Sequence, residues 1–140
     1  MAERDRQTFQ LEVVTPQRLI VNEEVEELVA PGSEGYFGVW PGHTPFMTTL
    51  KIGELSYKRR GEERFLAVSW GYAEVRPEKV IILVETAERS EEIDLIRAEQ
   101  AKAGAEERLR RWGDETVDFV QAQAALERAI TRVSVAAKGR

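Results

Sequence analysis

Proline is distributed unevenly along this 140-residue chain, and its distribution constrains the fold more than any other sequence feature. All five prolines and seven of the ten glycines lie in residues 1–86, whereas residues 87–140 have eleven alanines and no proline. Proline and glycine at short intervals mark turns between strands, while alanine, arginine, glutamate and leucine without proline favour helix. The chain is therefore expected to divide into an all-β part, residues 1–87, and a helical part, residues 88–140, that meet within residues 86–92.

The first part has the pattern of a sandwich or barrel. Apolar and polar side chains alternate in residues 9–13 and again in residues 55–58, as in strands with one buried face. The continuous apolar runs 65–70 and 80–84 predict strands that are buried on both faces. Turn signals recur about every 8 to 12 residues, which is the spacing of all-β folds, and residues 59–63 predict a hairpin tip.

The second part is predicted to be a hairpin of two helices, each about 20 residues long. Ser90 is the expected N-cap of the first helix, Gly113 its C′ residue, and Asp114 the cap of the second helix. Alanine-rich seams bury little area, so the hairpin is expected to be held weakly, and to detach or open into one extended arm. The expected apolar stripes are Ile93, Ile96, Ala101, Ala105, Leu109 and Trp112, then Phe119, Ala122, Leu126, Ile130, Val133 and Ala137.

Composition excludes several classes of function. The absence of cysteine excludes disulfides, thiolate zinc sites and a cysteine nucleophile, and a single histidine excludes a multi-histidine metal site, so no metal is expected. The formal net charge of −5 argues against binding of nucleic acid. No apolar run approaches the roughly 20 residues of a membrane span, and the charged start MAERDRQ is unlike a signal peptide. A soluble protein made in a cytoplasm-like compartment is expected.

Three local features have both an ordinary and a functional interpretation. Residues 31–45 are rich in glycine but lack the Gly-Lys-Ser/Thr ending of a phosphate loop, so they are interpreted as strand corners. His43 is interpreted as a turn histidine with a structural hydrogen bond; a small hydrolase using it is the alternative, although no Gly-x-Ser-x-Gly motif is present. The glutamates within residues 23–27 are interpreted as solvated charges at a strand edge, rather than as a calcium or acid–base site.

The end of the second predicted helix is basic. Residues 119–140 have a local net charge of +3, because Arg128, Arg132, Lys138 and Arg140 stand against Glu127 alone. A solvated helix face with cations near the helix C-terminus is one interpretation. A basic surface that binds phosphates or an acidic protein partner is the other.

Several motifs in a fixed order resemble one known family. They are Thr15-Pro16, Pro31-Gly32-x-x-Gly35-x-Phe37-Gly38-Val39-x-Pro41-Gly42-His43-x-Pro45, Phe65-x-Ala67-Val68-Ser69-x-Gly71-Tyr72-Ala73-Glu74-Val75, Ala87-Glu88, Ile93-Asp94-x-x-Arg97-Ala98 and Arg128-Ala129-x-x-Arg132-Val133-Ser134-Val135. In this order and spacing, the chain resembles the epsilon subunit of F-type ATP synthases, which is called delta in mitochondria, over nearly its whole length.

The resemblance implies a ten-stranded flattened β-sandwich in residues 1–87 and an antiparallel two-helix hairpin in residues 88–140. It implies a non-catalytic rotor subunit of the central stalk, whose sandwich binds the gamma subunit and the ring of c subunits. The mobile helices would extend toward the alpha/beta catalytic head and inhibit ATP hydrolysis, while the subunit couples proton translocation to ATP synthesis. The protein would then be peripheral at the cytoplasmic face of a bacterial plasma membrane, with the chloroplast thylakoid or mitochondrial inner membrane as alternatives.

Some bacterial members of the family bind ATP on the folded hairpin, so the resemblance also implies an ATP-sensing module as the alternative function. No cofactor is required, and ATP would be a regulatory ligand bound through arginines and carboxylates. Gly104 stands where the ATP-binding pattern has an arginine, and one lost phosphate contact costs about 1.5–3 kcal/mol; Arg108, one turn on, is a partial substitute. The positions that match the pattern are Glu88, Ile93, Asp94, Arg97, Arg128 and Arg132.

Overall fold

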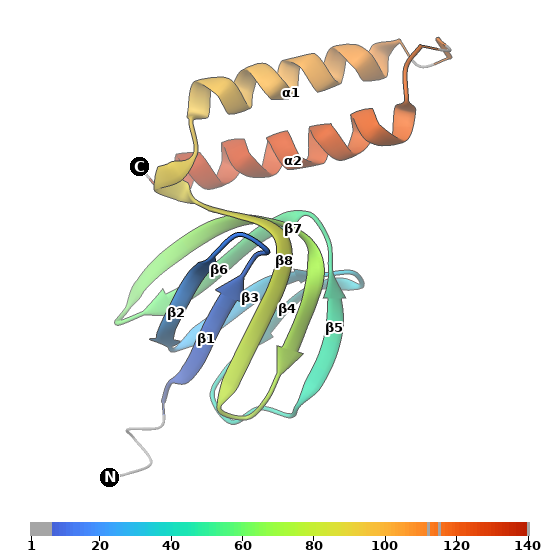
Figure 1. The fold of residues 1–140 in the computed structure, drawn as a ribbon. Coiled ribbons are helices and arrows are strands. Elements are labelled where there is room, and N and C mark those ends of the chain that lie inside the picture. Colours follow the sequence, from blue (N-terminus) through green and yellow to red (C-terminus); the bar gives the residue numbers. More distant parts are fainter. Residues whose placement is uncertain (1–6, 112, 115, 140) are drawn as a thin grey trace.

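The computed structural model describes residues 7–111, 113–114 and 116–139, so the predicted roles of Trp112 and Arg140 lie outside the described residues. A β-sandwich carries a helical hairpin across one end, and α2 rather than α1 faces the strands (Figure 1). The elements are β1 (Phe9–Val14), β2 (Leu19–Val25), β3 (Glu27–Gly32), β4 (Gly35–Val39), β5 (Phe46–Leu50), β6 (Gly53–Arg59), β7 (Glu62–Val75), β8 (Lys79–Arg89), the short 3₁₀ helix η2 (Ser90–Glu92), α1 (Leu95–Arg110) and α2 (Phe119–Lys138).

The strands follow the order β2-β1-β8-β7-β5-β3-β4, and β6 pairs with both β3 and β7. Strand β7 changes its edge partner within its length, because residues 62–68 pair with β6 and residues 71–75 pair with β5. The change falls at Trp70, whose φ of 34° is unusual for a residue other than glycine. At the next residue, a Cβ on Gly71 would lie 1.9 Å from the carbonyl oxygen of Leu83, so only glycine permits the close approach of β7 and β8.

The described residues form eight strands, and the ten strands implied by the resemblance are not confirmed. Strands β7 and β8 have 14 and 11 residues and stay continuous where the sheet turns its corner. Strand β8 pairs with β1 only through residues 79–83, while its pairing with β7 runs from residue 80 to Arg89, past the predicted end of the sandwich at residue 87.

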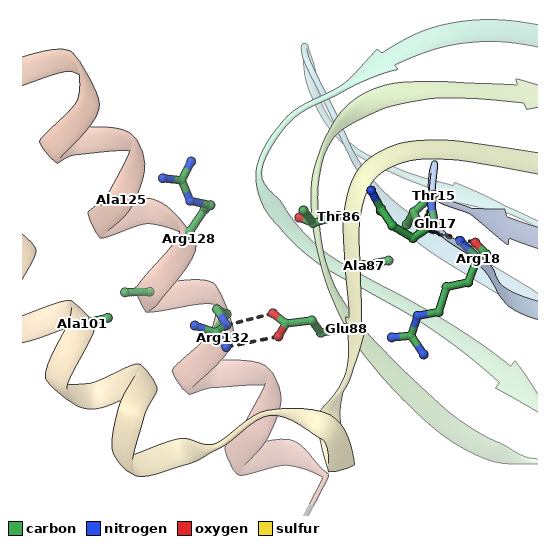
Figure 2. Close-up of a pocket in the computed structure, with 11 residues that line it drawn as sticks. Thr15, Gln17, Arg18, Thr86, Ala87, Glu88, Ala101, Ala125, Arg128 and Arg132 are labelled. Atoms are coloured by element: carbon green, nitrogen blue, oxygen red, sulfur yellow. Dashed lines mark hydrogen bonds and ion pairs between the residues drawn. The ribbon is translucent and has the colours of Figure 1, made fainter.

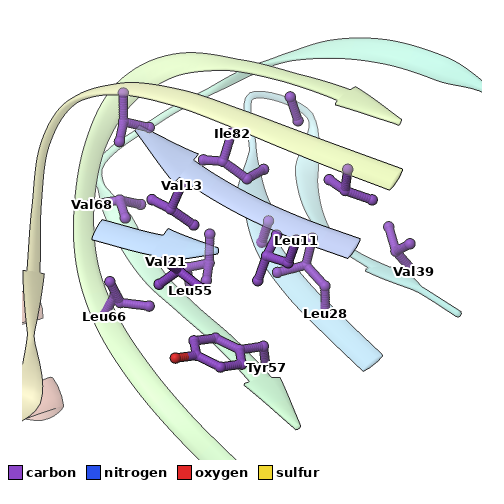
Figure 3. Close-up of a cluster of buried hydrophobic side chains, with 14 of the residues drawn as sticks. Leu11, Val13, Val21, Leu28, Val39, Leu55, Tyr57, Leu66, Val68 and Ile82 are labelled. Atoms are coloured by element: carbon purple, nitrogen blue, oxygen red, sulfur yellow. The ribbon is translucent and has the colours of Figure 1, made fainter. Parts of the chain in front are cut away.

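The core lies between the layers of the sandwich and follows the predicted alternation in β1 and β6 (Figure 3). Leu11, Val13 and Leu55 have no exposed surface. The prediction that residues 80–84 are buried on both faces is wrong, because Leu83 on β8 is 49% exposed between buried neighbours. This strand has one face on the core and one outer face, so its uninterrupted apolar run creates an apolar surface patch.

The predicted hairpin tip between β6 and β7 is confirmed. Arg60 and Gly61 connect the two strands with φ angles of 53° and 81°. Two successive positive φ angles match the twist of the flanking strands, as in a type I′ turn.

Both predicted helix caps are wrong. The N-cap of α1 is Asp94, whose carboxylate accepts from the backbone N–H of Arg97 at 3.2 Å, and the N-cap of α2 is Asp118. Ser90 instead begins η2 and is buried, because the C-terminal end of α2 packs against it. Asp114 accepts from the backbone and hydroxyl of Thr116 in the connection between the helices.

The end of the first helix differs less from its prediction. Gly113 has a φ of 94°, although it lies one position after the C′ residue, because the C-cap is Arg111. The two helices have 16 and 20 residues, against the expected 20 each.

The predicted apolar stripes of the two helices are only partly correct. Ile96 is 68% exposed and Ile130 is 46% exposed, although both belong to the predicted stripes. Small side chains fill the seam instead, since alanine allows the two helix backbones to approach closely. The buried residues of the two helices are Ala98, Ala105, Ala122, Ala129, Val135 and Ala136.

Helix α2 attaches the hairpin to the sandwich, through contacts with β6, β7 and η2. The buried apolar contact is small. Two carboxylates of the sandwich also form ion pairs with α2: Glu54 pairs with Lys138, and Glu88 pairs with Arg132. The buried apolar cluster consists of Ala67, Ile93, Ala98, Val135 and Ala136, with Phe65, Leu95 and Val133 partly buried around it.

Candidate functional site

A cavity of about 600 Å³ lies between α2 and the sandwich (Figure 2). The β1–β2 turn, the end of β8 and the facing side of the helices supply its walls. Small alanines on the helices leave the space open, and arginines project from both domains. The lining residues are Thr15, Gln17, Arg18, Thr86, Ala87, Glu88, Ala101, Ala125, Arg128, Ala129 and Arg132.

Arg132 and Glu88 form a bidentate ion pair at one side of this cavity. Arg132 Nε donates to Glu88 Oε1 at 2.8 Å, and Nη2 donates to Oε2 at 3.1 Å. Each side chain keeps about a third of its surface exposed, at 32% and 34%. The planar guanidinium matches two acceptor oxygens in this geometry, so it is also suited to two oxygens of a phosphate.

Arg128 lies one turn before Arg132 and lines the same cavity. Its guanidinium carbon lies 5.6 Å from the ring centroid of Trp70, a cation–π distance. Trp70 is the residue at which β7 turns the corner of the sandwich, so the strained backbone there presents an aromatic face to α2. Sequence reasoning missed Trp70 because no local motif indicates which side of the sheet it faces.

The structure brings together three of the six predicted site residues, Glu88, Arg128 and Arg132, on one cavity. The other three begin the first helix and are absent from the cavity lining in the described residues. Ile93 is buried in the apolar cluster, Asp94 caps α1, and the side chain of Arg97 is exposed. Gly104 has open space around it, and α1 reaches the cavity lining through Ala101.

The turn between β1 and β2 contributes site residues that the sequence did not indicate. Thr15 belongs to a motif of the resemblance, but the motif carries no signal for a cavity wall. Its hydroxyl accepts from the backbone N–H groups of Gln17 and Arg18 at 3.3 and 3.2 Å, and its own N–H donates to the Arg18 carbonyl at 2.9 Å. These bonds hold the backbone of Arg18 at the edge of the cavity.

The side chain of Arg18 pairs with Glu92 of η2. Its Nη1 and Nη2 atoms donate to the two carboxylate oxygens at 3.0 and 3.1 Å. The pKa of the Glu92 carboxyl lies below its ordinary value, first because of the Arg18 side-chain hydrogen bond, and then because the backbone N–H of Arg89 donates to it. The segment that joins the two domains is therefore tied to the β1–β2 turn.

A second hollow, of about 460 Å³, lies on the outer face of the sandwich and is almost entirely apolar. Tyr72 on β7 and Leu83 on β8 are directly paired in register and are 56% and 49% exposed. Val14 on β1 is the next partner of Leu83 across the sheet, and Pro16 and Trp70 also line the hollow. An exposed apolar groove of this kind is typical of a protein-contact surface.

His43 does not form the predicted structural hydrogen bond. In the described part of the chain both ring nitrogens are buried and have no hydrogen-bond partner, and the ring meets Phe46 edge-on at 6.0 Å. The histidine therefore has no acid to orient it within the described ranges, and the hydrolase alternative receives no support.

The glutamates of residues 23–27 are divided among different neighbours around a strand edge. Among residues 7–111, 113–114 and 116–139, no three histidine, aspartate or glutamate side chains converge as metal ligands. The individual contacts are Glu23 with Arg59, Glu24 with Thr8, Glu26 with the N–H of Gly61, and Glu27 with Lys58.

Neither described helix has the length and apolar character needed to cross a membrane.

Comparison with known protein families gives a match over both parts of the chain. Residues 8–90 match the beta-sandwich domain of the ATP synthase delta/epsilon chain, and residues 91–137 match its long alpha-helix domain. The two matches meet next to Ser90, within the segment that joins β8 to α1.

Individual relatives match along almost the whole chain. The chain is 50% identical to the ATP synthase epsilon chain 2 of Syntrophotalea carbinolica over 95% of its own length and 96% of that protein. It is 53% identical to the ATP synthase epsilon chain of Geotalea daltonii, over 93% and 94% of the two chains. A chain in the cryo-EM structure of the Euglena gracilis mitochondrial ATP synthase, an OSCP/F1/c-ring assembly, has a TM-score of 0.81 and 26% identity, covering 94% of this chain and 82% of that one.

Proposed function

The chain belongs to the family of ATP synthase epsilon subunits, and from this premise we propose that it couples proton translocation to ATP synthesis and restrains ATP hydrolysis. Epsilon chains are structural or regulatory subunits of the complex and are not catalytic by themselves. The observation that carries the proposal is the match of both family domains, in the same order, to the sandwich and the hairpin. The proposed place of the subunit is the central stalk, peripheral to the membrane at the cytoplasmic face of a bacterial cell.

The sandwich is proposed to bind the gamma subunit and the ring of c subunits. The apolar groove around Tyr72 and Leu83 supports a protein partner on this domain, because an exposed apolar face costs free energy unless a partner covers it. Leu83→Glu is expected to abolish co-purification with the gamma subunit, while Ile96→Glu, at an exposed position on α1, leaves it intact. If the Leu83→Glu variant still co-purifies with the gamma subunit, the apolar groove is not the surface that binds it.

The hairpin is proposed to leave the sandwich and extend toward the alpha/beta head, where it blocks hydrolysis. Its attachment combines a buried apolar cluster with ion pairs at Glu54 and Glu88, and water or another carboxylate can replace these pairs. After release, Arg128, Arg132 and Lys138 are available to an acidic segment of a partner. The positive charge of α2 then serves as a binding surface, although the chain as a whole is acidic.

Reconstitution of the catalytic complex tests the inhibitory role. Complexes containing the full chain are compared with complexes containing a version that ends at Arg89, which retains all of β8. We expect faster ATP hydrolysis with the shortened chain and equal binding of the two versions to the complex. Equal hydrolysis rates would show that the helices do not inhibit ATP hydrolysis. If neither version binds the catalytic complex, the proposed place of the chain in the central stalk is wrong.

An ATP-sensing role of the hairpin is the second candidate. The observation that favours it is the convergence of Glu88, Arg128 and Arg132 on one cavity. The arginines are proposed to bind phosphate oxygens, and the carboxylate to accept hydrogen bonds from the ribose or adenine. Calorimetry on the full chain is expected to detect ATP binding that Arg128→Ala weakens; absence of heat at millimolar ATP would reject this role.

A further inference from the structure

We propose that Arg18, on the sandwich, binds phosphate oxygens of a nucleoside triphosphate in the cavity beneath α2. This inference rests on the ATP-sensing role proposed above and assigns it a cation that lies outside the helical hairpin. The ligand then bridges the β1–β2 turn and α2, rather than the two helices alone.

The charges that line the cavity favour an anion. Arg18, Arg128 and Arg132 supply three guanidinium groups to the lining, which contains one carboxylate, that of Glu88; a second carboxylate, Glu92 of η2, lies outside the lining and pairs with Arg18, so the guanidinium groups still outnumber the carboxylates. The hydroxyls of Thr15 and Thr86 and the amide of Gln17 add neutral hydrogen-bonding groups to the same walls. A cavity with excess guanidinium and neutral donors suits a polyphosphate, whose oxygens accept several hydrogen bonds at once.

The helical hairpin supplies only part of this cationic lining. Arg128 and Arg132 come from α2, while α1 reaches the lining through the methyl group of Ala101. At Gly104 there is open space and no side chain. The third cation therefore comes from the opposite wall, at Arg18, which is far away in sequence from both arginines of α2 (Figure 2).

The turn holds the backbone of Arg18 and leaves its side chain able to change partner. The bonds between Thr15 and Arg18 hold the main chain, while the side chain is 52% exposed. An exposed ion pair with Glu92 contributes little stability, so its replacement by a phosphate costs little. A triphosphate carries more charge and more acceptor oxygens than one carboxylate, so it competes effectively for the guanidinium.

The test compares four forms of the full chain by calorimetry with magnesium ATP: the unmodified chain, Arg18→Ala, Glu92→Gln and Arg64→Ala. Glu92→Gln breaks the same ion pair but keeps the Arg18 guanidinium, so it separates a direct contact from a structural effect. Arg64→Ala is the matched control, because Arg64 is similarly exposed and pairs with Glu62 on β7. Circular dichroism confirms that each variant is folded.

We expect Arg18→Ala to weaken ATP binding about ten- to a hundredfold, the loss for one charge-assisted hydrogen-bonding group. Glu92→Gln is expected to bind ATP as tightly as the unmodified chain or more tightly, and Arg64→Ala is expected to bind it unchanged. Inorganic tripolyphosphate is expected to show the same dependence on Arg18, since the contact is to phosphate.

Equal weakening by Arg18→Ala and Glu92→Gln would overturn the proposal, because it would mean that the ion pair acts only by holding the joining segment. Unchanged affinity in Arg18→Ala would also overturn it, while leaving the ATP-sensing role intact. If the unmodified chain binds no ATP, the ATP-sensing role fails and the inference fails with it.

Discussion

Lys138 on α2 donates to both carboxylate oxygens of Glu54 on β6, at 2.9 and 2.7 Å. The same ammonium lies 5.4 Å from the ring centroid of Phe65, and Ser134 Oγ lies 3.4 Å from Glu54 Oε1. The Glu54 carboxylate thus contacts two residues in the last turns of α2, Ser134 and Lys138. Together with the pair of Arg132 and Glu88, it makes the docking of the hairpin depend on charge.

Removal of these carboxylate charges is expected to loosen the hairpin. Glu54→Gln and Glu88→Gln should each weaken the docking of the hairpin by about 0.5–1 kcal/mol. The effect is this small because the ion pairs are partly exposed. Faster hydrogen exchange in α2, with unchanged exchange in β1 and β8, would be the signature. Glu12→Gln is the control, since Glu12 on β1 pairs at 3.1 Å with Lys79 on β8 and neither residue belongs to the hairpin; an equal effect of this control on α2 would contradict the prediction.

Gly139 is expected to be essential for the contact between the end of α2 and η2. A Cβ at this position would lie 2.2 Å from Ser90 Oγ and 2.3 Å from Ser90 Cβ, so Gly139→Ala must push the helix end away. Limited proteolysis near η2 should become faster. Gly104→Ala is the control: nothing lies within 4 Å of the added methyl group, and α1 should gain about 1 kcal/mol of stability.

The pH dependence of stability is expected to include a contribution from Glu92. Its folded-state pKa is below the ordinary value of 4.5, so the stabilisation is present above that value and is lost as pH falls through the lower folded-state pKa. The stability difference between the unmodified chain and Glu92→Gln should therefore shrink on acidification below about pH 4.5. Denaturant unfolding at several pH values measures it, and a difference that grows on acidification would contradict the assignment.

Gly71→Ala is expected to be the most damaging small substitution in the sandwich. The added methyl group would lie 1.9 Å from the carbonyl oxygen of Leu83 and 2.7 Å from Val84 Cα, and both are backbone atoms that cannot rotate away. A loss of more than about 3 kcal/mol in the free energy of unfolding is expected. Ser56→Ala, on neighbouring β6, should change stability by less than about 1 kcal/mol; similar losses for both variants would contradict the argument.

Local patterns were sufficient for the elements whose residues interact with near neighbours. The alternation around Leu11 and Leu55 predicted their burial, and the turn at Gly61 was predicted because tight turns have few alternatives. The caps were wrong because several residues before each helix are able to cap it. The choice of Asp94 over Ser90 depends on the end of α2, which buries Ser90.

Candidate site residues show the same division. Glu88, Arg128 and Arg132 were identified by their match to a family pattern, and their convergence required the docking of α2 on the sandwich. Arg18 and Trp70 had no sequence signal as members of a site. Their roles arise where the β1–β2 turn and the corner of β7 meet the hairpin, which no local pattern describes.

The sequence by itself determined the division into an all-β and a helical part, because proline and glycine exclude long helices from the first part and alanine favours helix in the second. It also determined the family, through the order of its motifs. Only the tertiary structure decided that Arg132 and Lys138 of α2 pair with Glu88 and Glu54 of the sandwich, and that Arg18 joins the cavity. These relationships depend on contacts between residues far apart in the chain, which exist only once the hairpin is packed on the sandwich.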